Sequence, residues 1–458
     1  MRVVMYVHND VSQDARVLRE ASSLAQAGHS VTIVGRGDEP GESIGAGAQH
    51  RVAIVRVQPA GGHSMARAPW RAIRMVLRTA HAKLDVGPAE WPSATLDLVR
   101  AIVLVPYAVV RGAWVLLVNR WLRRPVNLHL VDFLHRWRVD VADWAHAAVD
   151  AAPTAEVHHA HDLEALPAAL RAADRDRSAV VYDKHEIFTG KRWLLAESPI
   201  TRWLVERWER RSMHRVDGLV TVNQAIADRL ARQLHPSRLV VVYNCPARYD
   251  PPATPVDHLR AAAGIAHGTP VALYHGGFTR DRGLVELVAA IREPGLEAVH
   301  AVFLGEGPLA DELKALATSP TADGRVHVLP AVPPEVLLDW ITTADVAVMA
   351  LQPWSLNHWL STPNKLFEAI AAGVPVVSSD FPERRRIVAD RSGPLGVLVD
   401  PTDPAAIAAG IRQLLEAAPA ERAALRARCL AAAHERWNWE IESAKLVELY
   451  AELAARRE

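Results

Sequence analysis

The sequence of 458 residues contains very little cysteine and no excess of either charge. Its two cysteines, Cys245 and Cys429, lie far apart, which excludes a disulfide framework and a C-x-x-C metal pair and fits a reducing cytoplasm. Lys plus Arg and Asp plus Glu both number 52, and this zero net charge argues against a dedicated nucleic-acid-binding protein. Hydrophobic residues make up 50% and charged residues 23%, which excludes a mainly disordered chain.

Long uninterrupted apolar segments are also missing. Residues 1–8 are short and apolar and lack the basic head and longer apolar stretch of a signal peptide. Residues 101–118 are the best candidate for a membrane-spanning helix, but Pro106, Arg111 and Gly112 interrupt them. We therefore expect a cytoplasmic protein without a transmembrane segment.

Several common catalytic and nucleotide-binding motifs are absent. After the first predicted strand the sequence is Val7-His-Asn-Asp-Val-Ser-Gln13, where a dinucleotide enzyme would carry G-x-G-x-x-G. A P-loop and a G-x-S-x-G elbow are absent as well, so a nicotinamide enzyme, an NTPase and a serine hydrolase are disfavoured. Asp174-Arg-Asp176 is a D-x-D pair that could bind a divalent cation, but its polar surroundings favour a solvated turn.

Strand-like and helix-like patterns alternate along most of the chain. Predicted strands at residues 2–8 and 30–34 flank a predicted helix at 14–27, which is the pattern of a β-α-β unit in a parallel sheet. The alternation stops at the proline-rich residues 250–255 and then begins again. We therefore predict an α/β protein with two successive doubly wound domains, a ligand cleft between them, and a long amphipathic helix at 439–456.

Residues 63–150 depart from this alternation and are strongly basic. Five basic residues and no acidic one lie between residues 67 and 83, and seven arginines against one acid lie between 100 and 138. A basic amphipathic helix with tryptophan at its edge is typical of an anionic membrane surface. The alternative is a helix docked on its own domain with a solvated arginine stripe. The residues that define the pattern are Arg67, Arg71, Arg74, Arg78, Trp114, Trp121 and Trp137.

Two glycine-containing turns follow predicted strands in the second half. In His275-Gly-Gly-Phe-Thr-Arg-Asp-Arg-Gly283, backbone amides, a helix N-terminus and Arg282 could together hold a diphosphate. Gly305-Glu-Gly-Pro308 is a second turn of this kind, for which a plain structural turn is the alternative.

The segment Ser361–Val377 combines a proline in the first turn of a predicted helix with Lys365 and Glu368 on one face. This arrangement places an ammonium group near the helix start and a carboxylate one turn later. A sugar nucleotide needs both, because its diphosphate is anionic and its ribose hydroxyls donate hydrogen bonds. A surface ion pair is the alternative.

Together these motifs resemble those of the retaining GT-B glycosyltransferases of the fourth sequence family, also called glycosyltransferase group 1. The resemblance covers nearly the whole chain except residues 63–150. It is most specific at Pro363-x-Lys-Leu-Phe-Glu368 with Gly373-Val-Pro-Val-Val377. The other matching residues are Asp14-x-Arg16, Ala27-Gly-His-x-Val31, His159-Ala-His-Asp162, Tyr182-Asp-Lys-His-Glu-Ile-Phe188, Val222 with Ala225, Tyr243-Asn-Cys-Pro246, Gly276-Gly277, Arg282-Gly283, Gly305-x-Gly-Pro308 and Ala344-Asp345.

The resemblance implies a GT-B fold of two Rossmann-like domains. Residues 1–249, including the basic segment 63–150, would hold the acceptor, and residues 250–436 would hold the nucleoside diphosphate sugar. Residues 437–458 would form a helix that packs back on the N-terminal domain. The implied reaction is metal-independent and cofactor-free sugar transfer with retention of configuration. The acceptor would be a glycan, a lipid-linked molecule or a small molecule; the basic segment 63–150 motivates the lipid-linked case, in cell-envelope or polysaccharide synthesis at the inner face of the membrane.

The resemblance also implies roles for individual residues. Glu368 resembles the carboxylate that binds ribose, and Arg282 stands where the family has its diphosphate lysine. His161 would lie near the transferred sugar, with a buried, hydrogen-bonded histidine as the alternative. The expected catalytic residues are His161, Arg282 and Lys365; the donor-binding residues are Gly276, Gly277, Arg282, Gly305, Glu306, Val328, Thr362, Pro363, Asn364, Lys365 and Glu368; and the acceptor-binding residues are Asn9, Asp14, His161, Asp162, His185 and Glu186.

Two positions depart from the family pattern. Leu360 stands where a glutamate often lies eight residues before Glu368, and Gly277 stands where an arginine often lies five residues before Arg282. Two other functions therefore stay open. A catalytically silent protein of the same fold would bind nucleotide without turnover, and a sugar-nucleotide epimerase would consume the donor without an acceptor.

Overall fold

The computed structural model describes residues 1–12, 14–37, 43–45, 51–58, 133–134, 137–190 and 199–456. The apolar candidate at 101–118 and most of the basic segment lie outside these residues. Within them, no helix has the length and apolar character needed to cross a bilayer.

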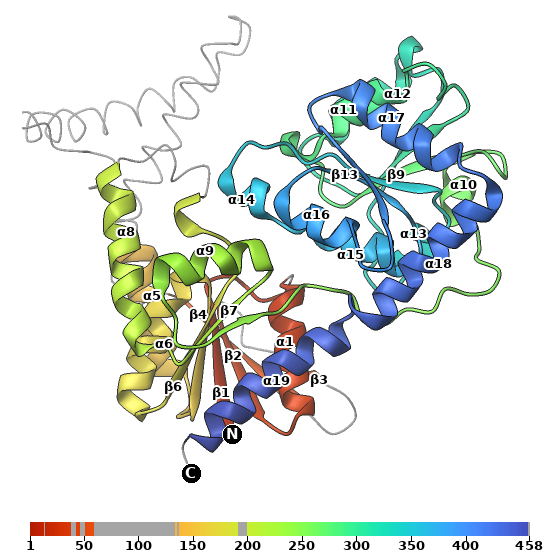
Figure 1. Cartoon of the computed structure of the whole chain (residues 1–458). Helices are drawn as coiled ribbons and strands as arrows, with labels where there is room; N and C mark the ends of the chain where they lie inside the picture. The colour runs from red at the N-terminus through yellow and green to blue at the C-terminus, as the bar shows by residue number, and fades with distance from the viewer. Residues whose placement is uncertain are drawn as a thin grey trace, which may run out of the picture.

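The N-terminal domain is built on an eight-stranded sheet in the order β3-β4-β2-β1-β5-β6-β7-β8 (Figure 1). All neighbouring strands are parallel except the pair β3 and β4. The sequence patterns did not predict β3 and β4. The strands are β1 Arg2–Val7, β2 Ser30–Arg36, β3 Ser43–Gly45, β4 Arg51–Val57, β5 Val157–His161, β6 Ala179–Lys184, β7 Gly218–Thr221 and β8 Leu239–Val241.

Helices cover both faces of this sheet, which explains why its central strands are apolar on both sides. One face packs against α5, α6, α8 and α9, and the other against α1 and the C-terminal helix α19. Asp14 caps α1 because its side chain accepts a hydrogen bond from the amide of Val17. The helices are α1 Ala15–Gln26, α5 Asp143–Ala151, α6 Asp162–Asp176, α8 Pro199–Ser212, α9 Gln224–Leu234 and α19 Trp439–Ala455.

The described end of the basic segment belongs to the core of this domain. Trp144 is fully buried, and its indole N–H donates to the carbonyl of Gly35 at 3.4 Å. Trp137 is half-buried and contacts the rings of Phe188 and Trp208. These contacts support, for Trp137, the alternative of a segment docked on its own domain.

The C-terminal domain is built on a fully parallel six-stranded sheet in the order β11-β10-β9-β12-β13-β14. The strands are β9 Val271–His275, β10 His300–Leu304, β11 Val326–Leu329, β12 Val346–Met349, β13 Val376–Ser379 and β14 Gly396–Val399. The helices are α10 His258–Ala263, α11 Leu284–Ala290, α12 Ala310–Thr318, α13 Leu337–Ile341, α14 Leu356–Leu360, α15 Asn364–Ala371, α16 Pro382–Val388, α17 Pro404–Leu415 and α18 Pro419–Glu435. The prediction of two doubly wound domains is confirmed.

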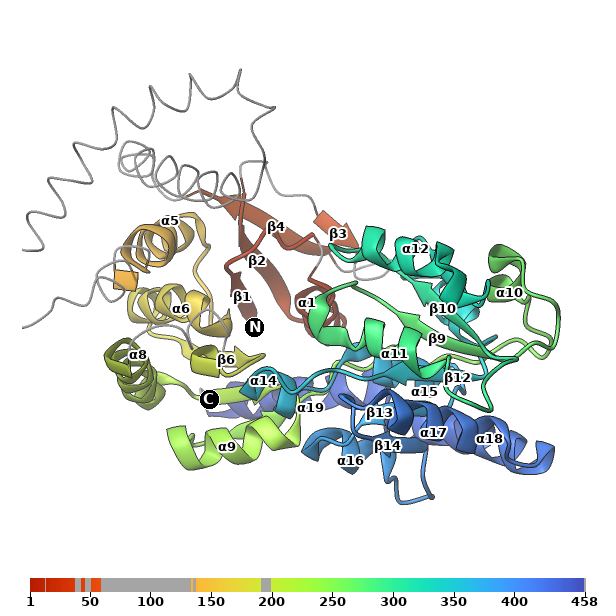
Figure 2. The same ribbon diagram turned by 90° about the horizontal axis from the view of Figure 1, so that it is seen from above.

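Two helices connect the domains. Helix α19 lies beside α1 (Figure 1), where Tyr450 Oη is 3.0 Å from His159 Nδ1 and Trp439 Nε1 donates to Ser23 Oγ at 2.9 Å. Helix α14 of the C-terminal domain extends to the N-terminal domain (Figure 2), where Leu356 and Leu360 pack against its hydrophobic core. The predicted return of the C-terminal helix is confirmed.

Candidate functional site

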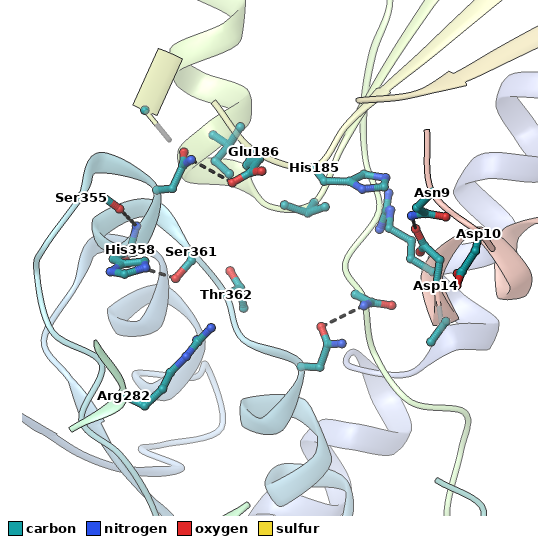
Figure 3. A pocket seen from close by; sticks show the side chains of 18 residues that line it. Asn9, Asp10, Asp14, His185, Glu186, Arg282, Ser355, His358, Ser361 and Thr362 are labelled. Carbon is teal, nitrogen blue, oxygen red and sulfur yellow. Dashed lines mark hydrogen bonds between the residues drawn. The ribbon is translucent and has the colours of Figure 1, made fainter. Parts of the chain in front are cut away.

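A cavity of about 820 Å³ lies between the two domains, a size that suits a small-molecule ligand. Its walls are the segments that follow parallel strands at their carboxyl ends, where ligands bind in doubly wound folds. Figure 3 shows Asn9 and Asp14 on one side of it and Arg282, His358 and Thr362 on the other. The site therefore takes side chains from both domains.

The loop after β1 is held by its own polar side chains. Asn9 Nδ2 donates to Asp14 Oδ2 at 2.9 Å, and Asn9 Oδ1 accepts from the amide of Val11. Val11 has a φ of +73°, a conformation that a β-branched residue rarely adopts. Such strain persists only where surrounding contacts enforce it. Asn9 and Asp14, two of the predicted acceptor residues, thus line the cavity from a constrained loop.

Below this loop lies a buried set of paired charges. Arg16 Nε is 2.9 Å from Asp183 Oδ2, and Arg16 Nη2 is 2.9 Å from Glu20 Oε1. Burial works against the charge of Asp183, but the Arg16 guanidinium and the His185 imidazole hold its pKa well below the usual range. Burial raises the pKa of Glu20, although Arg16 opposes this. The carboxylate of Asp183 is therefore balanced by two cations of the same wall.

The predicted acceptor set includes two histidines, His161 and His185, and the structure places them differently with respect to the cavity. His185 lines the cavity, and its ring nitrogens lie 3.0 Å from Asp183 Oδ2 and 3.3 Å from Asp162 Oδ2. Burial alone would lower its pKa, but Asp162 and Asp183 hold that pKa well above the usual range. His161 is fully buried behind it, stacked on His159 at 4.3 Å, and burial lowers its pKa. The geometry favours the alternative of a buried structural histidine for His161 and leaves His185 in the cavity.

Side-chain amides join the two domains across the cavity. Asn357 accepts from the amide of Ile187 at 3.0 Å and donates to Glu186 Oε2 at 3.0 Å. Asn223 donates to Thr362 Oγ1 at 3.0 Å, and Asn244 donates to Asn364 Oδ1 at 2.9 Å. Sequence reasoning missed Asn223 and Asn357. Asn223 also caps α9, and a capping asparagine looks the same in sequence whether or not it reaches another domain.

The second wall is formed by the cavity-lining residues of the C-terminal domain and by the next layer of side chains, in which the predicted Lys365 and Glu368 of α15 lie near the carboxyl end of β9. Glu368 Oε2 is 2.9 Å from His275 Nε2. Burial opposes ionisation of Glu368, but the contact with His275 keeps the pKa of Glu368 below the usual value. Lys365 Nζ lies 3.9 Å from the centre of the Tyr274 ring. Burial, together with the Arg282 guanidinium, lowers the pKa of Lys365 to about 7. Arg282 lines the cavity, and its Nε donates to Thr279 Oγ1 at 3.3 Å.

The two predicted glycine turns touch each other. Gly305 has a φ of +157°, and a Cβ there would lie 2.1 Å from the carbonyl oxygen of Gly276. A Cβ on Gly276 would lie 3.1 Å from Lys365 Nζ. Only glycine therefore allows these backbones and the lysine to approach so closely.

The predicted donor residues divide into two groups. Arg282, Thr362 and Asn364 line the cavity. The remainder lie outside it, at the ends of β9 and β10, within β11 or at the start of α15: Gly276, Gly277, Gly305, Glu306, Val328, Pro363, Lys365 and Glu368. Of the acceptor set, His161 and Asp162 lie outside the cavity. The binding and catalytic roles of these residues therefore stay predictions.

The structure shows the surroundings of the two departures from the family pattern. Leu360 packs against the first domain, and its carbonyl accepts from Asn223 Nδ2 at 2.8 Å. Gly277 accepts from the hydroxyl of Tyr274 at 2.7 Å, and a Cβ at this position would meet no atom within 4 Å. His358, which sequence reasoning missed, lines the cavity near Leu360 and pairs with Asp281 at 2.9 Å.

Among the described residues, one group has metal-ligating side chains within 4.8 Å of one another: Glu20, His159, His161 and Asp183. The guanidinium of Arg16 already pairs with both carboxylates, so a cation occupies that position. We assign no metal site there, and metal independence stays a prediction.

The Asp174-Arg-Asp176 pair lies in the last turn of α6. Asp176 accepts from the amide of Ala155 at 2.9 Å and is 3.0 Å from His158 Nε2. The prediction of a solvated turn is wrong for Asp176, because its carboxylate is buried and ties α6 to the start of β5.

Two family models match the chain: "Glycosyltransferase Family 4" at residues 89–245 and "Glycosyl transferases group 1" at residues 269–417. A D-inositol 3-phosphate glycosyltransferase of Xylanimonas cellulosilytica is 35% identical over 45% of this chain and 48% of its own length. That of Geodermatophilus obscurus is 30% identical over 61% and 58%. An alpha-maltose-1-phosphate synthase of Mycolicibacterium smegmatis is 25% identical over 64% and 84%. The chain thus spans about half the length of the first two curated relatives.

Solved structures resemble the whole chain. Sucrose-phosphate synthase from Thermosynechococcus elongatus has a TM-score of 0.68 at 17% identity, with both chains fully covered. Anabaena Alr3699/HepE in complex with UDP has a TM-score of 0.62 at 15% identity, covering 99% of this chain and 100% of that one. At these identities the likeness establishes the fold, which is of the GT-B type.

Proposed function

Because this chain belongs to the group 1 glycosyltransferases, we propose that it transfers a sugar from a nucleoside diphosphate sugar to an acceptor hydroxyl, with retention of configuration. The observation that carries the proposal is the second wall. Arg282 and Lys365 lie there beside two glycine turns and the carboxylate of Glu368. Cations and amides suit a diphosphate, and a carboxylate suits the ribose hydroxyls.

In the proposed reaction, the bond between the anomeric carbon and the diphosphate oxygen breaks, and a bond to the acceptor oxygen forms on the same face. A leaving phosphate oxygen accepts the proton of the acceptor hydroxyl. Negative charge grows on the diphosphate as it leaves, and the fixed cations Arg282 and Lys365 stabilise that charge. Arg282 and Lys365 provide this stabilisation without a metal ion, so we propose metal-independent catalysis in the cytoplasm.

The solved relatives support the donor class. The Anabaena protein is described in complexes with UDP and with UDP-glucose. The curated relatives are named for inositol 3-phosphate and maltose-1-phosphate, but the acceptor wall here carries the carboxylates of Asp10, Asp14 and Glu186. We therefore propose an acceptor that offers neutral hydroxyl groups to this wall.

A panel of nucleoside diphosphate sugars, each incubated with simple polyol and glycan acceptors, tests the proposal through release of nucleoside diphosphate and formation of a glycoside. Release that depends on an acceptor supports a transferase. Donor consumption without acceptor would instead identify an epimerase, and nucleotide binding without turnover would identify a silent binding protein.

The proposal includes a lipid-linked acceptor at an anionic membrane surface, motivated by the basic, tryptophan-bearing sequence at 63–132. Flotation with vesicles of anionic lipid, compared with vesicles of zwitterionic lipid, tests this part separately. If the protein floats with neither kind of vesicle, the membrane part of the proposal is refuted and a small soluble acceptor is favoured.

A further inference from the structure

We infer that Arg384 on α16 is a buried, unpaired cation that raises the affinity of the second wall for a diphosphate. The inference rests on the proposed function, since it concerns the same donor site, but neither the sequence motifs nor the family resemblance pointed to this residue. Arg384 acts on the ligand through its charge, as a positioning residue beneath the site.

The surroundings of Arg384 are apolar and contain few acceptors. Its side chain is fully buried, and its guanidinium carbon lies 5.0 Å from the centre of the Phe381 ring. Nη1 makes one long contact of 3.4 Å to the carbonyl of Met349, while Nε and Nη2 have no hydrogen-bond partner. Among the residues that the structure describes, no carboxylate forms an ion pair with it. A buried guanidinium in this state is rare, because desolvating a charge is costly unless a partner compensates it.

Arg384 shares its location with the two predicted diphosphate cations. The carbonyl that Arg384 contacts belongs to Met349, the last residue of β12. The next carbonyl, that of Ala350, would lie 2.1 Å from a Cβ on Gly283, so the end of β12 touches the residue that directly follows Arg282. Lys365 lies at the end of the neighbouring strand β9, and α16 itself follows β13. Three cations therefore meet at the carboxyl ends of three adjacent strands.

The nearby carboxylates leave Arg384 uncompensated. Asp281 is paired with His358 at 2.9 Å and with Arg282 at 3.9 Å and accepts from Thr279, and Glu368 is paired with His275. Burial, with a further contribution from the nearby Arg282 guanidinium, lowers the pKa of Arg384 to about 9. A ligand with two or more negative charges is the group that would offset the charge of Arg384.

This arrangement predicts opposite effects on folding and on binding. Without ligand, the buried charge destabilises the fold, so its removal raises the unfolding midpoint. With a diphosphate bound, the same charge is compensated and contributes to affinity. Arg385, the next residue on α16, provides a matched control, because it is exposed and pairs with Asp380 at 2.6 Å.

The test compares Arg384→Met, Arg384→Lys and Arg385→Met with the wild-type full chain, using inorganic pyrophosphate as the probe in calorimetric titration and thermal unfolding. We expect Arg384→Met to unfold at the same or a higher temperature and to bind pyrophosphate at least about tenfold more weakly. Arg384→Lys should keep most of the affinity, and Arg385→Met should change neither quantity.

The inference is overturned if Arg384→Met binds pyrophosphate as the wild type does, if it fails to fold, or if the wild type does not bind pyrophosphate. These outcomes are separable from the proposed function through sugar transfer measured on the same samples. Transfer by the wild type with normal pyrophosphate binding by Arg384→Met refutes the inference alone. Arg384-dependent pyrophosphate binding without transfer by the wild type refutes the proposed function alone.

Discussion

The two walls of the cavity treat buried charge in opposite ways. On the N-terminal wall, Arg16 and His185 are paired with Asp183 and Asp162 before any ligand arrives. On the C-terminal wall, Arg384 has no partner and Lys365 has a pKa lowered to about 7 by burial and by Arg282. A balanced wall suits a neutral acceptor, whereas a wall with excess positive charge suits an anionic donor.

The comparison also separates stability from function. A paired buried cluster holds the first domain together, and removing one member leaves an uncompensated charge. The second wall carries its uncompensated charge in the unliganded state, and removing it should weaken binding and not folding. Apart from the controls, each substitution below changes the charged residues of one wall and leaves the other wall intact.

The largest effect is expected from Asp183→Asn. The substitution keeps the shape of the side chain but leaves Arg16 and His185 without their shared carboxylate, so we expect a loss of about 3–5 kcal/mol in the free energy of unfolding. Chemical denaturation measures it. Asp380→Asn, which removes an exposed partner of Arg385, is the control and should change stability little. Equal effects of the two variants would contradict the proposed balance.

Arg282→Ala should reduce kcat/KM for sugar transfer by about 100-fold or more, because it removes a fixed charge from the leaving diphosphate. The unfolding midpoint should stay close to that of the wild type, since Arg282 is partly exposed. Steady-state kinetics measure the first quantity and thermal unfolding the second. The control is Arg280→Ala, which removes an exposed arginine of the same turn that pairs with Glu312. Full activity of Arg282→Ala would refute the assignment.

Glu368→Gln separates ribose binding from diphosphate binding. Loss of the charged acceptor should weaken binding of a nucleoside diphosphate by about 10- to 100-fold. Binding of inorganic pyrophosphate, which has no ribose, should hardly change. Titration calorimetry with both ligands measures the difference, and a parallel loss for both would remove the ribose role from Glu368.

Lys365 should make donor binding dependent on pH. Because its pKa is about 7 in the unliganded protein, the ammonium form is progressively lost above that pH. Affinity for pyrophosphate should fall between pH 7 and pH 8 by up to about fivefold, in addition to any change from the ligand itself. Lys365→Arg, which stays charged, should show a flatter profile, and identical profiles would contradict the prediction.

The same pKa shift has a consequence for folding. In the unfolded chain the ordinary pKa of this lysine is 10.5, so between about pH 7 and pH 10.5 the unfolded state binds more protons than the folded state. The contribution of Lys365 to stability therefore rises with pH across this window and is constant below it. Comparing wild type with Lys365→Met in denaturation curves at pH 7 and pH 9 measures this contribution.

Much of the fold could be predicted because apolar periodicity marks buried elements. The pattern at residues 271–274 predicted β9, and the pattern at residues 365–372 predicted α15, each within one residue. Strand β3 was missed because it has only three residues and lies at the sheet edge, which makes its pattern too short to identify. Strand β4 was missed although its sequence, RVAIVRV, is mostly apolar and the residues around it carry turn signals such as Asp38-Glu-Pro-Gly41.

Individual site residues could be predicted only where they belong to a recognisable sequence motif. Lys365 and Glu368 were found because their spacing on a helix indicates a shared face. Arg384 was missed inside a run of three arginines, although its spacing from Phe381 and Ile387 matches the buried face of α16. Which of His161 and His185 faces the cavity depends on β5 being buried on both sides, and a motif does not specify this.

The most direct test of the central claim compares the affinity of the wild-type chain for nucleoside diphosphates with its affinity for the corresponding nucleosides. The cations of the C-terminal wall predict that the diphosphate of at least one base binds about 100-fold or more tightly than its nucleoside, with the difference lost in Arg282→Ala. Equal affinities for diphosphate and nucleoside across all bases would contradict the account.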